Sequence, residues 1–122
     1  MTPIFQVALG GAIGASLRYM TGLMMARLLG KGFPWGTLTV NIVGSFLMGV
    51  LVVVLAQTGN RFAPLLMTGL LGGFTTFSAF SLDVVTLYER GQVALAGGYV
   101  AASVAVSIAA LFAGLLLARS LT

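Results

Sequence analysis

The chain has 122 residues, of which 59% are hydrophobic and only 7% are charged, with a formal net charge of +4. Soluble domains carry about 25% charged residues, so this composition excludes a soluble globular domain, and a mean hydropathy of +1.11 excludes a disordered chain. Cys and His are absent, which removes disulfides, thiol nucleophiles, His acid–base catalysis and nearly every transition-metal site. The few basic residues are dispersed, unlike the clustered basic face of a nucleic-acid-binding protein. We expect an integral membrane protein that is neither an enzyme nor a partner of nucleic acid.

Four apolar stretches are long enough to cross a bilayer, which takes about 20 residues each. In chain order they are Ile4–Leu29, Trp35–Gln57, Phe62–Tyr88 and Val93–Ala118. No basic segment precedes the first stretch, so we interpret it as a transmembrane helix and not as a signal peptide. The sequence predicts one all-α, multi-pass membrane domain over residues 1–122, surrounded by the lipid bilayer.

Basic residues near the helix ends are almost evenly divided between the two sides of the membrane. With four crossings, one side carries Arg61 and Arg119, and the other carries Arg27, Lys31 and Arg90. Because such residues set orientation, this balance leaves two interpretations open. Either the charges specify the orientation only weakly and another factor sets it, or copies of the chain insert in both orientations and pair antiparallel.

Two polar residues lie inside the first two predicted helices, where burial without a partner is costly. Arg18 is about 20 Å into its span at about 1.5 Å of rise per residue. It either extends toward the membrane surface, pairs with carbonyls or supplies positive potential to an aqueous vestibule. Asn41 either joins two helices by hydrogen bonds or donates its amide to an anion.

The third span contains the run Gly72-Gly73-Phe74-Thr75-Thr76 in its middle. Adjacent glycines make a poor helix interior, since each costs about 1 kcal/mol relative to Ala. We favour a break in this helix, which would expose half-helix ends that bind ions, over simple packing of small residues.

Aromatic and hydroxyl side chains share faces of the last two spans. Phe77 and Phe80 are three residues apart, and rings aimed edge-on present a positive edge to a small anion, although lipid-facing Phe is ordinary. Tyr99, Ser103 and Ser107 are spaced by four and form a hydroxyl stripe, unless the Ser side chains simply bond their own helix.

The two carboxylates, Asp83 and Glu89, are both expected near the end of the third span. A proton-coupled transporter usually needs a carboxylate relay within the membrane, and paired-carboxylate catalysis needs two acids at one substrate. A permeation pathway of amides, hydroxyls, ring edges and backbone therefore remains.

Three segments in order resemble the signature segments of the Fluc fluoride channels, also called CrcB proteins. They are Gly11-Ala12-Ile13-Gly14-Ala15-Ser16-Leu17-Arg18-Tyr19, Asn41-Ile42-Val43-Gly44-Ser45-Phe46 and Gly72-Gly73-Phe74-Thr75-Thr76-Phe77-Ser78-Ala79-Phe80. The resemblance covers the whole chain. Ala79 departs from it by standing where Thr is common, and Phe74 stands where an aliphatic residue is usual.

The resemblance implies a passive fluoride channel in the bacterial inner membrane. It implies an antiparallel, dual-topology homodimer of four-helix subunits, each with a break in helix three. The implied fluoride pathway comprises Asn41, Thr76, Phe77, Ser78, Phe80, Tyr99, Ser103 and Ser107, with Arg18 at a vestibule. It also implies a structural sodium ion at the dimer interface, bound by the backbone carbonyls of Gly72 and Thr75.

Two alternatives belong to other classes. Small multidrug transporters are similar in size and often of dual topology, but they rely on a Glu in the first helix, which this chain lacks. A membrane assembly subunit without transport activity would use its Gly-rich faces only for packing.

Overall fold

The computed structural model describes residues 2–121, which contain five α-helices and one π-helical segment. In chain order they are α1 (Pro3–Leu29), α2 (Trp35–Thr58), the π-helical segment η1 (Pro64–Leu71), α3 (Gly72–Phe74), α4 (Ser78–Glu89) and α5 (Val93–Leu121). Together, η1, α3 and α4 occupy the third predicted span. The all-helical class and the interruption of the third stretch are therefore confirmed.

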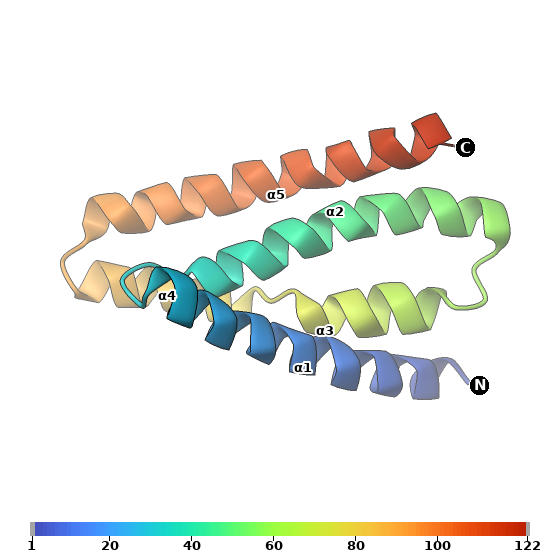
Figure 1. Cartoon of the computed structure of the whole chain (residues 1–122), viewed down its shortest axis with the longest axis horizontal. Helices are drawn as coiled ribbons and strands as arrows, with labels where there is room; N and C mark the ends of the chain where they lie inside the picture. The colour runs from blue at the N-terminus through green and yellow to red at the C-terminus, as the bar shows by residue number, and fades with distance from the viewer. Residues whose placement is uncertain (1, 122) are drawn as a thin grey trace.

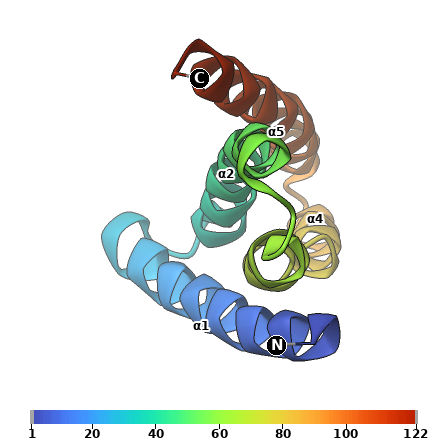
Figure 2. The same ribbon diagram turned by 90° about the vertical axis from the view of Figure 1, so that its right-hand side faces the viewer.

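The long helices run along the longest axis of the molecule, with α5 and α1 on opposite sides of α2 (Figures 1 and 2). Both termini and the α2–η1 connection lie at one end, and the α1–α2 and α4–α5 connections lie at the other (Figure 1). The most extensive packing joins α2 to α5 and α1 to η1. This arrangement brings the interruption before α4 to the middle of the molecule.

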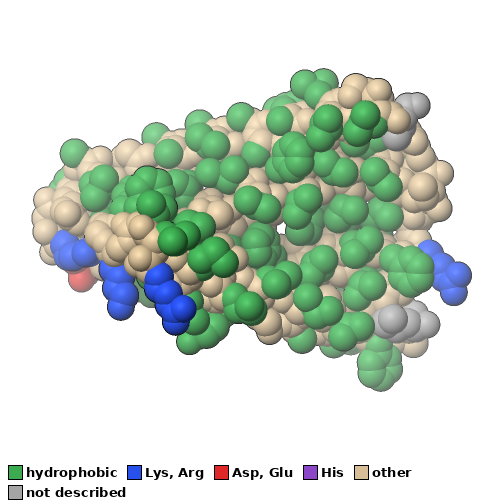
Figure 3. All heavy atoms as spheres, viewed as in Figure 1, with side chains coloured by type: hydrophobic (Ala, Val, Ile, Leu, Met, Phe, Trp, Pro, Cys, Tyr) green, Lys and Arg blue, Asp and Glu red, His purple; other side chains and the backbone are tan. Residues whose placement is uncertain are grey.

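Three stretches within residues 2–121 are long and apolar enough to cross a membrane: Trp35–Thr58, Pro64–Glu89 and Val93–Leu121. The first helix, α1, has 27 residues and sufficient length, but it is less apolar than these three. Apolar side chains cover the middle of the visible face, while Lys and Arg lie toward its ends (Figure 3). This is the surface of a multi-pass membrane protein.

Glycines let two helix pairs approach to backbone contact. A Cβ on Gly10 or Gly14 of α1 would collide with backbone carbonyls of Leu65 and Leu70. Between α2 and α5, a Cβ on Gly114 would meet the Phe46 carbonyl. Small residues at helix interfaces are the usual means of close packing in membranes, where lipid removes the hydrophobic driving force between helices.

Two helices end on glycines whose backbone is left-handed. Gly30 follows α1 with φ of 82°, and Gly59 follows α2 with φ of 107°. Each donates its N–H to a carbonyl of the preceding helix turn, 3.0 Å for Gly30 and 2.9 Å for Gly59. These sharp stops keep the connections short, so α1 and α2 are joined by only a few residues.

Candidate functional site

The interruption between α3 and α4 is a stretch of non-helical backbone at Thr75–Phe77. Thr75 is extended, with φ of −85° and ψ of 158°. Asn41 of α2 holds the next residue at two points: its Oδ1 accepts from the Thr76 N–H at 2.9 Å, and its Nδ2 donates to the Thr76 carbonyl at 3.0 Å. The predicted break is confirmed, and Asn41 fastens it to α2.

Asn41 therefore fulfils the interhelical role that the sequence left open, and its amide keeps a second N–H. A side-chain amide carries two N–H donors, and the bond to Thr76 uses one of them. Asn41 also lines a cavity of about 530 Å³. The two interpretations of this residue are thus compatible: it fixes the break and presents a donor to the cavity.

Arg18 of α1 also bonds the backbone beside the break. The half-buried side chain donates from Nε to the Gly73 carbonyl at 3.1 Å. Of the alternatives for Arg18, the structure shows pairing with a carbonyl. Arg18 also lines a cavity of about 260 Å³ together with Thr76 and Ala79. A Thr in place of Ala79 would therefore put a hydroxyl into this cavity.

Two carbonyls lose their usual helical donors at the break. A continuous helix would direct the Thr76 N–H to the Gly72 carbonyl and the Ala79 N–H to the Thr75 carbonyl. The Thr76 N–H instead bonds Asn41, and the Ala79 N–H bonds the Thr76 hydroxyl at 3.2 Å. The carbonyls of Gly72 and Thr75 are thereby left for other partners.

The cavity that Asn41 lines has a volume of about 530 Å³ and lies beside the break, between α2, α4 and α5. We call it the central cavity. Of the predicted site residues, it is lined by Asn41, Gly72, Thr75, Thr76, Phe77, Phe80, Ser103 and Ser107. Its walls carry an amide, hydroxyls and aromatic rings, and none of its described lining residues is charged. Such a lining offers a small ion hydrogen-bond donors and ring edges without a fixed charge.

Ser103 is a buried polar side chain on the wall of the central cavity. Only 5% of the residue is exposed, and its Oγ has no hydrogen-bond partner among the described residues. An unpaired buried hydroxyl is costly, and such groups in native proteins call for an explanation such as an unseen ligand. Ser103 therefore offers a donor to a bound species.

Tyr99 lies on the same face of α5 but outside the lining of the central cavity. It is fully buried, and its hydroxyl donates to Oδ2 of Asp83 at 3.1 Å. The hydroxyl stripe is thus divided, because Ser103 and Ser107 face the cavity while Tyr99 turns to a carboxylate. Asp83 is half-buried on α4 and lies toward the Glu89 end of the third span, where it lines a cavity with Arg90.

Phe77 and Phe80 are in contact, with ring centroids 5.3 Å apart and planes tilted by 56°. Phe80 is 8% exposed, whereas Phe77 is 75% exposed at the start of α4. Ser78 lies beside them, its hydroxyl 3.3 Å from that of Thr76, and does not line the central cavity. A single chain thus leaves one ring of the pair uncovered.

Gly44 and Ser45 line the central cavity but were not among the predicted site residues. They lie three and four residues after Asn41, so they share its helix face. The space beside Gly44 is occupied by the methyl group of Thr75. The i+3 and i+4 spacing from Asn41 is the signal that would have found both.

The fold and site together define a multi-pass helical membrane protein with a broken helix and, beside the break, an uncharged cavity lined partly by an amide and hydroxyls. The family described as "CrcB-like protein, Camphor Resistance (CrcB)" matches residues 5–115, and the chain belongs to this family. Family members are ion channels and not enzymes, which confirms that expectation and the resemblance found in the sequence.

Several curated relatives carry the name fluoride-specific ion channel FluC. One from Cereibacter sphaeroides is 66% identical over 119 residues, covering 98% of this chain and 96% of the relative. Another, from Agrobacterium fabrum, is 56% identical over 124 residues and covers 99% of both chains. A third, from Paracoccus denitrificans, is 56% identical over 117 residues, covering 95% of this chain and 94% of the relative.

Proposed function

We propose that this chain is a fluoride-selective channel that passively exports cytoplasmic fluoride across the bacterial inner membrane. The observation that carries the proposal is the unpartnered hydroxyl of Ser103 on the wall of an uncharged cavity. The names of its relatives support fluoride as the ion. Passive flow suffices, because HF enters from an acidic exterior, dissociates inside and leaves fluoride to drain down its gradient.

The chemistry of the cavity supports selection of fluoride. Fluoride is small and tightly hydrated, so a selective pore must replace its water with several oriented donors while a narrow bore excludes chloride. The spare amide N–H of Asn41 and the Ser103 hydroxyl supply such donors. The positive ring edges of Phe77 and Phe80 add contacts without a fixed charge that would hold the ion too tightly.

We further propose that the pathway is completed in an antiparallel homodimer. Non-helical backbone at membrane depth is tolerated only where protein or a water-filled cavity covers it. In one chain, Phe77 beside the break is 75% exposed, and Gly72 and Ser78 are also exposed. A second copy would cover them. The nearly balanced basic residues at the two ends support insertion in both orientations.

A structural sodium ion at this interface is also part of the proposal. The carbonyls of Gly72 and Thr75 lack their helical donors, and carbonyl oxygens at a broken helix suit a sodium ion. Two carbonyls from each of two copies would supply four ligands. We expect that exhaustive replacement of sodium by a large organic cation dissociates the dimer or stops flux; normal assembly and conduction would exclude the site.

The first test is fluoride efflux from liposomes that contain the purified protein, measured with a fluoride electrode beside a chloride control. We expect fast fluoride flow without chloride flow. No flow from a well-folded protein would exclude the channel and favour the assembly subunit, whereas proton-coupled export of organic cations would favour the multidrug transporter.

The second test separates the pathway from the fold. Phe80→Met should reduce fluoride flux at least about tenfold while the assembled protein survives in detergent, because it alters a contact in a site that relies on geometry. Asn41→Asp should reduce flux at least as strongly, and it also loses the bond from Nδ2 to the Thr76 carbonyl. Phe112→Met is the matched control, since Phe112 is 60% exposed on α5. Flux equal to the parent in the first two variants would overturn the assigned pathway.

A further inference from the structure

A second cavity lies at the end of the molecule where the α1–α2 and α4–α5 connections meet. We call it the end cavity; it has a volume of about 260 Å³ and shares no lining residue with the central cavity. Lys31 and Arg90 line it, as does the carboxylate of Asp83. Two cations at its wall give it the means to attract anions from solution.

Tyr99 separates the two cavities. It is fully buried and lines neither of them, yet it contacts the walls of both. Its ring centroid lies 5.2 Å from that of Phe80, on the central cavity, and 5.3 Å from that of Phe33, on the end cavity. Its hydroxyl is held by Asp83 on the end-cavity side. Tyr99 therefore lies between lining residues of both cavities, and we call its side chain the partition.

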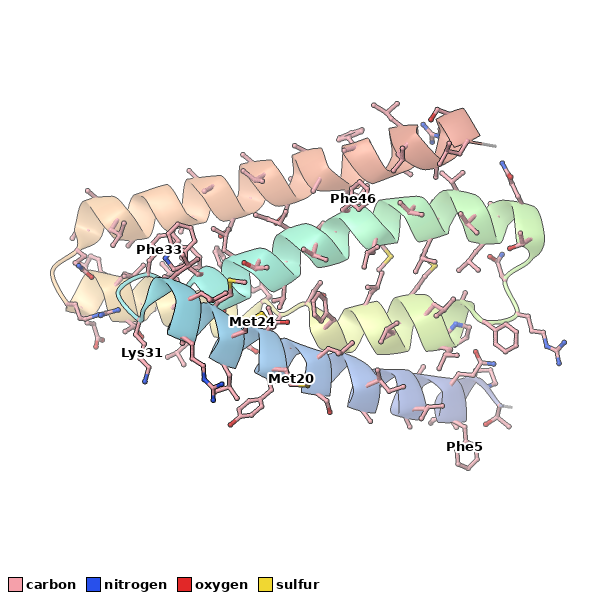
Figure 4. The ribbon with its side chains drawn as sticks, viewed as in Figure 1. Phe5, Met20, Met24, Lys31, Phe33 and Phe46 are labelled. Atoms are coloured by element: carbon pink, nitrogen blue, oxygen red, sulfur yellow. The ribbon has the colours of Figure 1, made fainter. Side chains whose placement is uncertain are left out.

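Phe33 belongs to the short connection between α1 and α2 and is directed inward. It is half-buried and packs against the cluster that contains Phe80 and Tyr99, whereas Lys31 is exposed. Figure 4 shows Phe33 inside this end of the molecule and Lys31 extending away from it. The connection begins at Gly30 with positive φ and ends at Pro34, so its path is constrained.

The Phe33 ring contacts the Tyr99 ring in an edge-to-face arrangement. The two rings meet at 85°, an edge-to-face geometry that favours one ring orientation. Phe33 also contacts Trp35, with ring centroids 4.6 Å apart. With Phe33 in place, the Tyr99 ring is confined between two aromatic neighbours and its hydroxyl stays on Asp83.

We propose that Phe33 is a positioning residue that holds Tyr99 in place and so keeps the partition between the central and end cavities closed. Without the Phe33 ring, Tyr99 is able to turn, its hydroxyl leaves Asp83 and the anion passes toward Lys31 and Arg90. This inference rests on the proposed function, because it assigns a rate-limiting step to the same fluoride route.

The test measures fluoride efflux over a range of fluoride concentrations in Phe33→Ala, Phe33→Leu and Phe33→Tyr. Phe33→Ala should raise the maximal flux per protein about two- to tenfold, the factor expected from losing one edge-to-face aromatic contact. Phe33→Leu retains apolar bulk without a ring and should give a smaller increase. Phe33→Tyr retains the ring and should restore the parent value.

Phe62→Ala is the matched control, because Phe62 lies in the connection at the opposite end and is 43% exposed. It should leave flux unchanged. A merely structural role for Phe33 would lower flux by reducing the folded fraction, so decreased or unchanged flux in a conducting protein overturns the inference alone. A parent protein that conducts no fluoride overturns the proposed function as well.

Discussion

The two halves of the third helical stretch are held by opposite kinds of contact. Before the break, η1 and α3 meet α1 through glycines, with backbone against backbone. After the break, α4 is anchored by the buried side chains of Phe80 and Leu87 against Tyr99 and Ala96 of α5. At the α1 contacts of the first half, a larger residue in place of glycine would collide with backbone. The second half is stabilised by the side chains that it buries.

The largest predicted change in the free energy of unfolding comes from a substitution in the second half. Leu87→Ala should lower the free energy of unfolding by about 2 kcal/mol or more, because Leu87 is 1% exposed and its loss leaves a cavity. Leu82→Ala on the same helix, where Leu82 is 67% exposed, should change it little. Reversible unfolding in detergent micelles measures both. Equal losses would show that burial in the chain does not determine the stability of α4.

In the first half, adding an atom should lower the free energy of unfolding by an intermediate amount. Gly14→Ala should cost about 1–3 kcal/mol, because the new Cβ meets the Leu70 carbonyl and the Phe74 amide. Gly11→Ala, with open space beside it, should be neutral or stabilising by up to about 1 kcal/mol through helix propensity. The same unfolding assay compares the two, and a stable Gly14→Ala protein would contradict backbone contact between α1 and η1.

The smallest predicted change in the free energy of unfolding comes from a substitution in the break between the two halves. Thr76→Val keeps the side-chain shape but removes the hydroxyl that accepts from the Ala79 N–H, and should destabilise the protein by about 1 kcal/mol. Thr86→Val is the control, since the Thr86 hydroxyl is exposed and bonds a carbonyl within its own helix. If both variants unfold alike, the start of α4 does not depend on Thr76.

Much of the architecture follows from the sequence because its causes are local. Apolar length predicts the helices, and adjacent glycines near two threonines predict a break in the third span, since helix propensity depends on neighbouring residues. The structure places this break at Thr75–Phe77. Periodicity also places Ser103 and Ser107 on one face. These features need no knowledge of what lies opposite them.

Only the tertiary structure determines which partner each polar group finds. The sequence does not reveal that Asn41 holds the Thr76 backbone at two points, that Arg18 bonds Gly73, or that Tyr99 turns from the Ser stripe to Asp83. In each case the partner comes from another helix or from backbone freed by the break. Such pairings depend on how helices cross, and the crossing is set by where glycines permit backbone contact.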